Sequence, residues 1–327
     1  MNQRASWLDL GIRAGFMVAV YCIFAAQIPT YYSLNGIAAL LDGAVLTGVI
    51  AAGIGTTMLA GEFDLSVGSM AAVAGVVTIK IFGLGVLPAI AAATVIAGVL
   101  GALQGLLIGS LGINSLVFTI GTLIALRGIA LILSGENTVT VPIEQLSDID
   151  VLTERVLGVF SPLSGVLVAV FVTVGLLLRF TRFGREIYAI GGGRNEARAA
   201  GVPILRPMII AFALSGTLAG LGGALLSVRS GSASPLAFDT VLLSAATTCL
   251  IGGIALQGGR GNIIGIAIGL FTLRFFVAGV ASLGAPYWLQ NLATGALLIL
   301  VIATQLVPAV LGGRRVRSRP SPAPAQP

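Results

Sequence analysis

The sequence contains no histidine, one lysine and two cysteines among its 327 residues. Without histidine, His-based acid–base catalysis and most zinc sites are excluded, and we expect no metal site. Cys22 and Cys249 lie far apart within apolar runs, so a disulfide framework is not expected. A phosphate-cradling loop ends in Lys-Ser or Lys-Thr, but Lys80 is followed by Ile81. The chain therefore has no P-loop of its own, and an intramembrane enzyme is disfavoured because no catalytic constellation is present.

Charged residues are also scarce. They make up 9% of the chain, whereas a soluble domain has roughly a quarter. Hydrophobic residues make up 57%, and the mean hydropathy is +1.04. Apolar runs of about 20 residues recur, and each is long enough to cross a bilayer as a helix. We therefore predict an all-α integral membrane protein, a polytopic bundle embedded in the lipid bilayer, rather than a barrel of short alternating strands.

The basic residues lie in short segments between the apolar runs, where orientation signals belong. The net charge of +6 therefore indicates membrane topology and no nucleic-acid partner. About ten spans are predicted, near residues 11–28, 36–60, 66–83, 87–109, 115–134, 161–180, 207–228, 240–256, 262–283 and 288–310. The first is predicted to be uncleaved rather than a signal peptide, because it leads into Pro29 and the interfacial pair Tyr31 and Tyr32.

Loop composition predicts the orientation. Residues 181–206 are strongly basic, as expected of a cytoplasmic loop, whereas 135–160 carry five acidic residues against Arg155 alone, as expected of an external one. Both termini are then cytoplasmic. Residues 1–311 are predicted to form one transmembrane domain, and 312–327, rich in Arg, Ser, Pro and Ala, a disordered cytoplasmic tail.

The basic loop contains the signals of a very short helix. Asn195 can act as its N-cap, Glu196 lies in its first turn, Gly201 suits a left-handed exit and Pro203 stops continuation. A helix this short is not stable alone in water and needs a surface to dock against. It is therefore a candidate coupling element, through which a second subunit would act on this chain.

Two carboxylates stand beside the membrane core in the stretch Gly61–Ser69. Such residues usually face a cavity or a partner, and Asp64 and Ser66 are candidates for a break in a helix that lines a polar pathway. The alternative is an ordinary cytoplasmic turn in which Asp64 or Ser66 caps the next helix. The segment 56–61 also resembles 247–252, which would fit an internal repeat or chance similarity in Gly- and Ala-rich sequence.

Several polar residues lie within the spans, namely Asp42, Gln104, Asn114, Arg127, Arg274 and Asn291. Taken singly, each is expected to form hydrogen bonds between helices. We add Gln104, Asn114 and Asn291 to Asp64 and Ser66 as tentative pathway residues. Glycines at four-residue spacing predict close helix packing, at Gly101, Gly105 and Gly109, at Gly216 and Gly220, and at Gly261, Gly265 and Gly269.

Three motifs resemble the ribose-type permeases of bacterial ABC importers. Gly61–Ser69 is similar to the family's G-x-x-D-L-S-V-G-S signature, Thr181–Val202 to its T-x-x-G-R…G-x-N-x-x-A-A-x-x-S-G-I region, and Ile251–Gly261 to its L-G-G-x-x-L-x-G-G-x-G turn. The resemblance runs from about Leu40 to Leu306. Glu62 and Phe63 depart from the small or aliphatic residues usual there, and Ala200 replaces the usual Ser.

The resemblance implies a permease in the bacterial cytoplasmic membrane, paired with a second permease subunit, two ATP-binding cassettes and an extracytoplasmic solute-binding protein. ATP and Mg²⁺ would be bound by the cassettes and not by this chain. Arg194, Asn195, Glu196, Arg198 and Gly201 would lie in the helix that contacts a cassette. The expected cargo is a monosaccharide or related polyol.

Other functions stay open at this point. The same architecture could carry a nucleoside, an autoinducer-2-like signal or an amino acid. A secondary transporter working alone would need an intramembrane carboxylate relay, for which Asp42, Glu62 and Asp64 are the candidates.

Overall fold

The computed structural model describes residues 3–155 and 158–312. Within these ranges, seven helices are long and apolar enough to cross a membrane, which confirms an all-α polytopic membrane protein. They are α1 (Gln3–Gln27), α2 (Leu34–Leu59), α4 (Val86–Leu111), α5 (Ser115–Ser134), α7 (Pro162–Phe180), α10 (Leu205–Ser230) and α12 (Ile263–Ser282). The predicted tail lies, apart from Gly312, outside the described residues.

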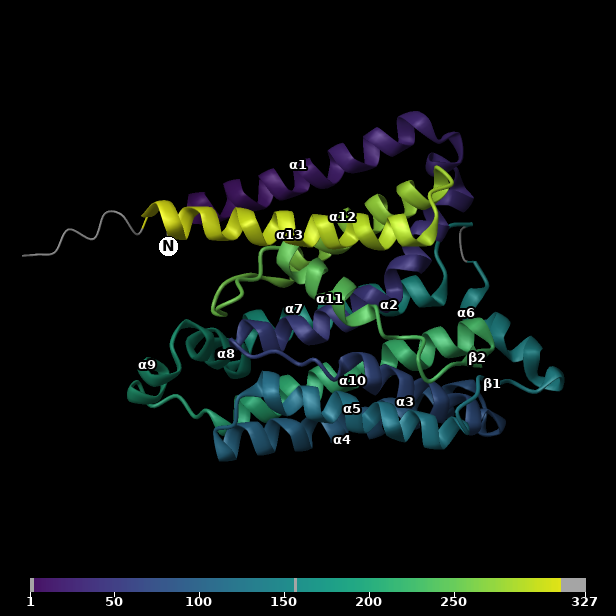
Figure 1. Cartoon of the computed structure of the whole chain (residues 1–327), viewed down its shortest axis with the longest axis horizontal. Helices are drawn as coiled ribbons and strands as arrows, with labels where there is room; N and C mark the ends of the chain where they lie inside the picture. The colour runs from purple at the N-terminus through teal and green to yellow at the C-terminus, as the bar shows by residue number, and fades with distance from the viewer. Residues whose placement is uncertain (1–2, 156–157, 313–327) are drawn as a thin grey trace, which may run out of the picture.

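The remaining helices are shorter, except for α13, in which Tyr287–Leu300 is apolar. They are α3 (Val67–Lys80), α6 (Asp150–Thr153), α8 (Arg182–Gly192), α9 (Arg194–Ala199), α11 (Val241–Ile251) and α13 (Tyr287–Gly312), with short 3-10 helices η1 (Pro29–Tyr32), η2 (Phe82–Leu84) and η3 (Ile143–Ile149). Figure 1 shows the long helices running roughly side by side, with α8 and α9 at one end of the bundle and β1 (Val139–Thr140) and β2 (Ser232–Ala233) at the other.

The two strands were not predicted. They pair antiparallel, with Val139 opposite Ala233 and Thr140 opposite Ser232. Each strand has only two residues, too few for an alternating pattern to be visible in the sequence. Pairing joins the segment after α5 to the segment after α10 at the end of the bundle opposite α8 and α9.

The centre of the bundle is formed by α2 and α10, the most buried of the long helices. α10 packs against α4 so closely that backbones touch, because glycines on both helices leave no side chain between them. A Cβ on Gly101 would overlap the Phe212 carbonyl, and one on Gly216 would overlap the Ala97 carbonyl. This confirms the predicted packing role of these two glycines.

The third predicted glycine series is only partly helical. Gly265 and Gly269 lie on α12 and face the end of α11, where a Cβ on Gly269 would overlap the Thr248 carbonyl. Gly261 precedes the helix and has a φ of +127°. It therefore belongs to the turn and not to the packing strip.

Two of the predicted spans are interrupted. α3 has 14 residues and α11 has 11, or about 21 and 16 Å of helix, against a hydrocarbon core of about 30 Å. The predicted span 240–256 is too long, because α11 ends at Ile251 and residues 252–262 form a turn. Each short helix is preceded by non-helical chain, over 60–66 before α3 and 234–240 before α11.

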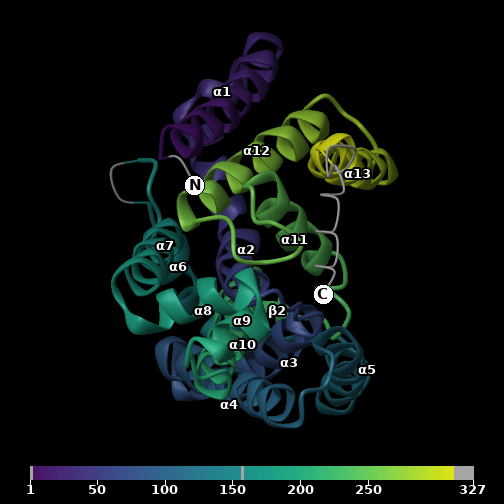
Figure 2. The same cartoon turned by 90° about the vertical axis from the view of Figure 1, so that its left-hand side faces the viewer.

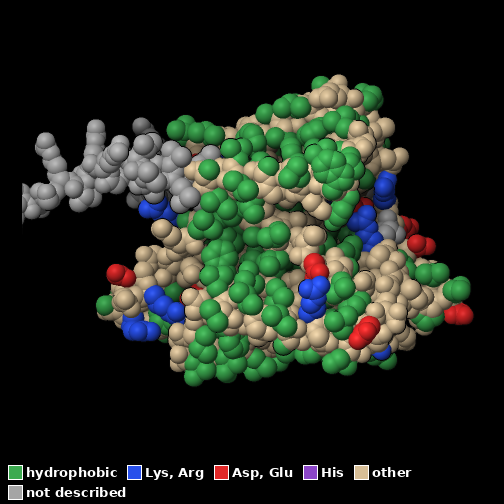
Figure 3. Space-filling model, viewed as in Figure 1, with side chains coloured by type: hydrophobic (Ala, Val, Ile, Leu, Met, Phe, Trp, Pro, Cys, Tyr) green, Lys and Arg blue, Asp and Glu red, His purple; other side chains and the backbone are tan. Residues whose placement is uncertain are grey.

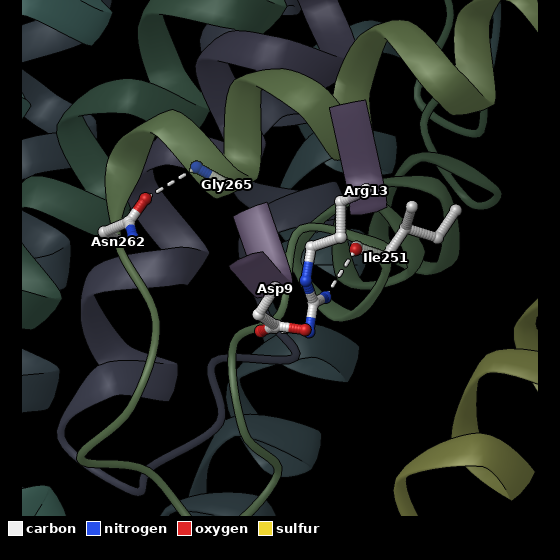
Figure 4. Close-up of polar contacts among 5 residues, drawn as sticks. All are labelled: Asp9, Arg13, Ile251, Asn262 and Gly265. Carbon is white, nitrogen blue, oxygen red and sulfur yellow. Dashed lines mark hydrogen bonds and ion pairs between the residues drawn. The ribbon is translucent and has the colours of Figure 1, made fainter. Parts of the chain in front are cut away.

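α1 lies apart from the centre, beside α12 (Figure 2). Phe24 and Tyr31 pack near Phe275 and Phe276 in a separate small apolar cluster. The Tyr31 hydroxyl donates a hydrogen bond to the Phe275 carbonyl at 2.5 Å. At the other end, Arg13 donates to the Ile251 carbonyl at 2.8 Å and pairs with Asp9 at 3.0 Å (Figure 4). A cation is favourable there because Ile251 ends α11.

Candidate functional site

The predicted coupling region forms two short helices, α8 and α9, at one end of the bundle. Thr181 caps α8 by accepting from the Gly184 N–H at 3.3 Å. Phe183, Ile187 and Ile190 are buried on one face of α8, while Arg182 and Arg185 are exposed. α8 is therefore an amphipathic helix docked on the bundle, which meets the requirement that so short a helix needs a supporting surface.

The N-cap predicted for α9 is wrong. The helix begins at Arg194, its N-cap is Gly193, and Asn195 lies inside the first turn. A Cβ on Gly193 would overlap the Glu196 carboxylate, which is the end of a flexible, exposed side chain, so a larger residue there would require that side chain to move. The predicted exit is confirmed: Gly201 has a φ of +78°, and the Gly201 and Val202 N–H groups donate to Arg198 and Ala197 carbonyls. This is a Schellman-type end.

The predicted coupling residues differ in the exposure of their side chains. Asn195, Glu196 and Arg198 are exposed on α9, whereas Ala197 is buried against the rest of the chain. Arg194 is half-buried and pairs with Glu62 at 3.1 Å, and the Glu62 side chain is only 13% exposed. α9 thus presents three polar side chains outward while Arg194 ties it to the turn after α2.

Three segments meet backbone to backbone where α8 joins the bundle. The Gly259 N–H donates to the Leu59 carbonyl at 2.9 Å, which joins the turn after α11 to the end of α2. A Cβ on Gly191 of α8 would overlap the Leu59 carbonyl, and a Cβ on Gly258 would lie 2.6 Å from the Gly61 Cα. We call Gly61, Gly191, Gly258 and Gly259 the glycine junction.

Tyr188 adds a side-chain link across this junction. Its hydroxyl donates to the Gly261 carbonyl at 2.9 Å. Burial raises the pKa of the Tyr188 phenol above its ordinary value, so the hydroxyl stays protonated and remains a donor. Together with the Arg194–Glu62 pair, it connects α8 and α9 to the ends of both α2 and α11.

The second predicted group forms a buried polar cluster before α3. Asp64 is fully buried, and its carboxylate accepts from the Ser66 N–H at 3.0 Å, the Ser66 hydroxyl at 2.6 Å and the Ser215 hydroxyl at 2.7 Å. The Gln104 amide donates to the Ser66 hydroxyl at 3.1 Å. Asp64, Ser66 and Gln104 are therefore brought together, with Ser215 as a fourth member that the sequence analysis missed.

This arrangement favours a covered segment inside the bundle over an ordinary turn at its end, although Asp64 does accept from the Ser66 N–H just before α3. Asp64 and Ser66 are both 0% exposed, and the Ser66 side chain makes no capping bond to α3. The segment runs back into the bundle, which is allowed for non-helical chain only where protein covers it. α5 covers it, since Ser115 accepts from the Phe63 N–H at 3.1 Å and Thr119 donates to the Phe63 carbonyl.

Asn114 and Asn291 do not join this cluster. Asn114 is exposed and caps α5, accepting from the Leu116 N–H at 2.9 Å. Asn291 is exposed on α13. The two asparagines stay predictions as pathway residues, separate from the buried group.

Partners of the two arginines within the spans are now visible. Arg274 donates to the Ala39 and Leu40 carbonyls and fills the space above Gly43, where a Cβ would overlap its guanidinium. Arg127 on α5 pairs with Asp239 at 2.7 Å, and the two side chains remain 40% and 52% exposed. Arg274 is therefore part of the packing, whereas the Arg127–Asp239 pair lies on a surface.

The similar segments 56–61 and 247–252 both end a helix, and each is followed by the same turn. The Gly61 N–H donates to Met58 and the Glu62 N–H to Thr57; the Gly253 N–H donates to Leu250 and the Ile254 N–H to Cys249. Gly61 and Gly253 have φ of +78° and +88°. The structural equivalence is shifted by one residue from the predicted alignment, which paired Gly61 with Gly252.

The breaks in the two interrupted spans also meet. A Cβ on Gly68, in the first turn of α3, would lie 2.9 Å from the carbonyl oxygen of Phe238, just before α11. Phe238 is 2% exposed and precedes Asp239, the partner of Arg127. The first turn of α3 therefore packs directly against the backbone that leads to Asp239.

Ser215→Ala tests the energetic role of the cluster. Removing this hydroxyl leaves one Asp64 oxygen without its donor in a fully buried site, so the free energy of unfolding should fall by about 1–3 kcal/mol. The measurement is denaturant unfolding of the purified chain in detergent.

Ser227→Ala is the matched control, because Ser227 is also buried on α10 but its hydroxyl has no partner among the described residues. Its stability should stay close to that of the wild type. Equal losses in both variants would contradict a specific role for the cluster.

Comparison with known proteins assigns the chain to a family. Residues 36–302 match the family described as "Branched-chain amino acid transport system / permease component". An L-arabinose ABC transporter permease protein of Azospirillum brasilense is 31% identical over 89% of this chain and 86% of its own. The ribose import permease protein of Escherichia coli K12 is 29% identical (88% and 90%), and its D-allose transport system permease protein is 31% identical (88% and 88%). No solved structure matches the chain significantly. The chain, a multi-pass protein of the inner membrane, belongs to the family of permease components of ABC importers.

Proposed function

We propose that this chain is the membrane-spanning subunit of an ATP-driven importer for a monosaccharide or related polyol. The observation that carries the proposal is the glycine junction, through which α8 and α9 contact the ends of both α2 and α11. An exposed polar helix held rigidly against the ends of a complete span, α2, and an interrupted one, α11, is suited to transmit movement from another subunit into the membrane.

The proposed assembly contains a second permease subunit, two ATP-binding cassettes that bind ATP and Mg²⁺, and an extracytoplasmic solute-binding protein. In it, residues 1–311 form one permease domain of about ten crossings, counting α3 and α11 as interrupted ones, with both termini and the loop 181–206 in the cytoplasm. The residues of 135–160 are then external, and β1 and β2 lie at the external end. The concentration of basic residues around α8 and α9 supports this orientation.

The sugar assignment comes from the relatives, three of which carry arabinose, ribose or allose in their names. The family description mentions branched-chain amino acids, so an amino acid, like a nucleoside or an autoinducer-2-like signal, is the alternative cargo. A secondary transporter is disfavoured by geometry. Asp42 accepts from Ser161, Glu62 pairs with Arg194, and Asp64 is held by serines, so each candidate carboxylate already has partners.

Purified solute-binding protein encoded beside this chain should show a higher melting temperature with one pentose, hexose or polyol and no change with amino acids or nucleosides. The loaded protein should then drive ATP-dependent uptake of that sugar into proteoliposomes that contain the chain and the cassettes. A shift with amino acids alone would overturn the cargo. Uptake by the chain without cassettes would overturn the importer.

We infer that the substrate pathway runs along the face formed by α5, α11 and α13, between two permease subunits. Arg127 lies about 18 Å along α5 from Ser115, deep in a predicted span. A half-exposed ion pair at that depth is costly against lipid and usually faces a bundle interior or a water-filled cavity. Figure 3 shows one face of the molecule, on which charged side chains are few and apolar and uncharged groups predominate.

The neutral double variant Arg127→Gln/Asp239→Asn tests this pathway. It retains hydrogen-bonding side chains of similar size, so the melting temperature should stay near that of the wild type. Uptake should fall roughly tenfold, because the charges that the passing hydroxyl groups meet are gone. If the pair only holds α5 to the chain before α11, uptake will remain unchanged, and the pathway must lie elsewhere.

Glu196→Ala and Arg198→Ala test the role of α9. Both side chains are exposed and make no ion pair among the described residues, so their loss should not affect folding of the chain. Uptake should fall roughly tenfold while the assembled complex still hydrolyses ATP, since α9 would no longer follow the cassette. Both activities are measured in proteoliposomes with loaded solute-binding protein.

Arg182→Ala is the matched control for charge, because Arg182 is exposed on α8 in the same basic loop. It should retain coupled uptake. Wild-type uptake in both α9 variants would refute the coupling role, as would an equal loss in Arg182→Ala.

A further inference from the structure

A cavity of about 450 Å³ opens where α7, α8 and α12 meet, with Leu10 of α1 at its side. It lies at the end of the bundle that carries α8, close to the contacts in Figure 4, where Asn262 caps α12 by accepting from the Gly265 N–H. Neither the substrate pathway nor the α9 helix uses this cavity. Its lining combines basic and apolar side chains.

The mouth of the cavity is cationic. Arg179 in the last turn of α7 and Arg185 on α8 both line it, both are exposed, and neither takes part in an ion pair among the described residues. Among the residues that the structure describes, no acidic side chain lines the cavity. Two uncompensated guanidinium groups at one opening favour an anionic ligand with oxygen acceptors.

Apart from Tyr188 and Asn262, the rest of the lining is apolar and lies along membrane-spanning helices. Leu178 and Gly175 line it from α7, and Ile263 and Ile264 line it from α12. Gly175 leaves the space open, since a Cβ there would lie 3.0 Å from the Ile263 side chain. An apolar slot that continues from a cationic mouth fits a hydrocarbon chain attached to an anionic group.

We propose that this cavity binds one anionic phospholipid, with the phosphate between Arg179 and Arg185 and an acyl chain in the slot beside Gly175. Cationic pockets between membrane helices are a known type of site for such headgroups. The lipid would fill the space between α8 and the first turn of α12, next to the turn that forms the glycine junction. This site is independent of the cargo and of the cassette contact.

Native mass spectrometry of the purified chain in detergent tests the proposal, with phosphatidylglycerol and phosphatidylcholine of identical acyl chains as probes. The wild type should retain phosphatidylglycerol in preference to phosphatidylcholine. Arg179→Gln/Arg185→Gln should weaken phosphatidylglycerol binding roughly 30-fold, since each cation contributes to attraction of an anionic headgroup. Water-soluble glycerol phosphate should not compete, which distinguishes a lipid from a free phosphate.

Arg182→Gln/Arg206→Gln is the matched control, because it removes two exposed positive charges from the same loop but none from the cavity. It should bind phosphatidylglycerol as the wild type does. Gly175→Leu should also weaken binding by filling the slot without changing charge. Equal losses in both double variants would show only diffuse electrostatic attraction, and full binding by Arg179→Gln/Arg185→Gln or competition by glycerol phosphate would overturn the site.

Discussion

Direct backbone contact at the glycine junction is the constraint on which the proposed mechanism depends. Where α2 ends, the Leu59 carbonyl is in contact with Gly191 of α8 and accepts a hydrogen bond from Gly259 in the turn after α11. Side chains can change rotamer to absorb a small displacement, but packed backbones cannot. A shift of α8 must therefore be followed by the ends of both spans or must break the junction.

Both α2 and α11 are also connected to the start of α3. The chain after α2 re-enters the bundle and contains the buried Asp64 and Ser66. The chain before α11 contacts Gly68 at the start of α3. Buried polar groups that are fully paired hold a single arrangement, because any alternative leaves a group without a partner. The Asp64 cluster therefore acts as a rigid support, whereas the exposed Arg127–Asp239 pair is better suited to contact with a hydrated substrate.

Composition and spacing were sufficient to predict the fold class, close packing at the glycines of α4 and α10, though not that these two helices contact each other, and the left-handed end at Gly201. They were insufficient where the partner lies far along the chain. Ser215 is separated from Asp64 by 151 residues and Glu62 from Arg194 by 132, and neither separation leaves a local pattern. The N-cap of α9 was misassigned for a different reason. Asn195 is the better capping residue by type, but the helix begins one residue before it, at Arg194, so Gly193 takes the cap position and Asn195 falls in the first turn.

Glu62 departs from the family pattern, and the structure gives a physical reason why a carboxylate is tolerated at this position. Small or aliphatic residues are usual at this position in the ribose-type permeases, and a carboxylate with 13% exposure would be costly there without a partner. Arg194 supplies that partner from the start of α9. The pair spans the distance between the turn after α2 and the helix proposed to contact the cassette. In this chain an ion pair therefore reinforces the connection that backbone packing makes at the glycine junction, and the two contacts resist separation in different ways, one by charge and one by shape.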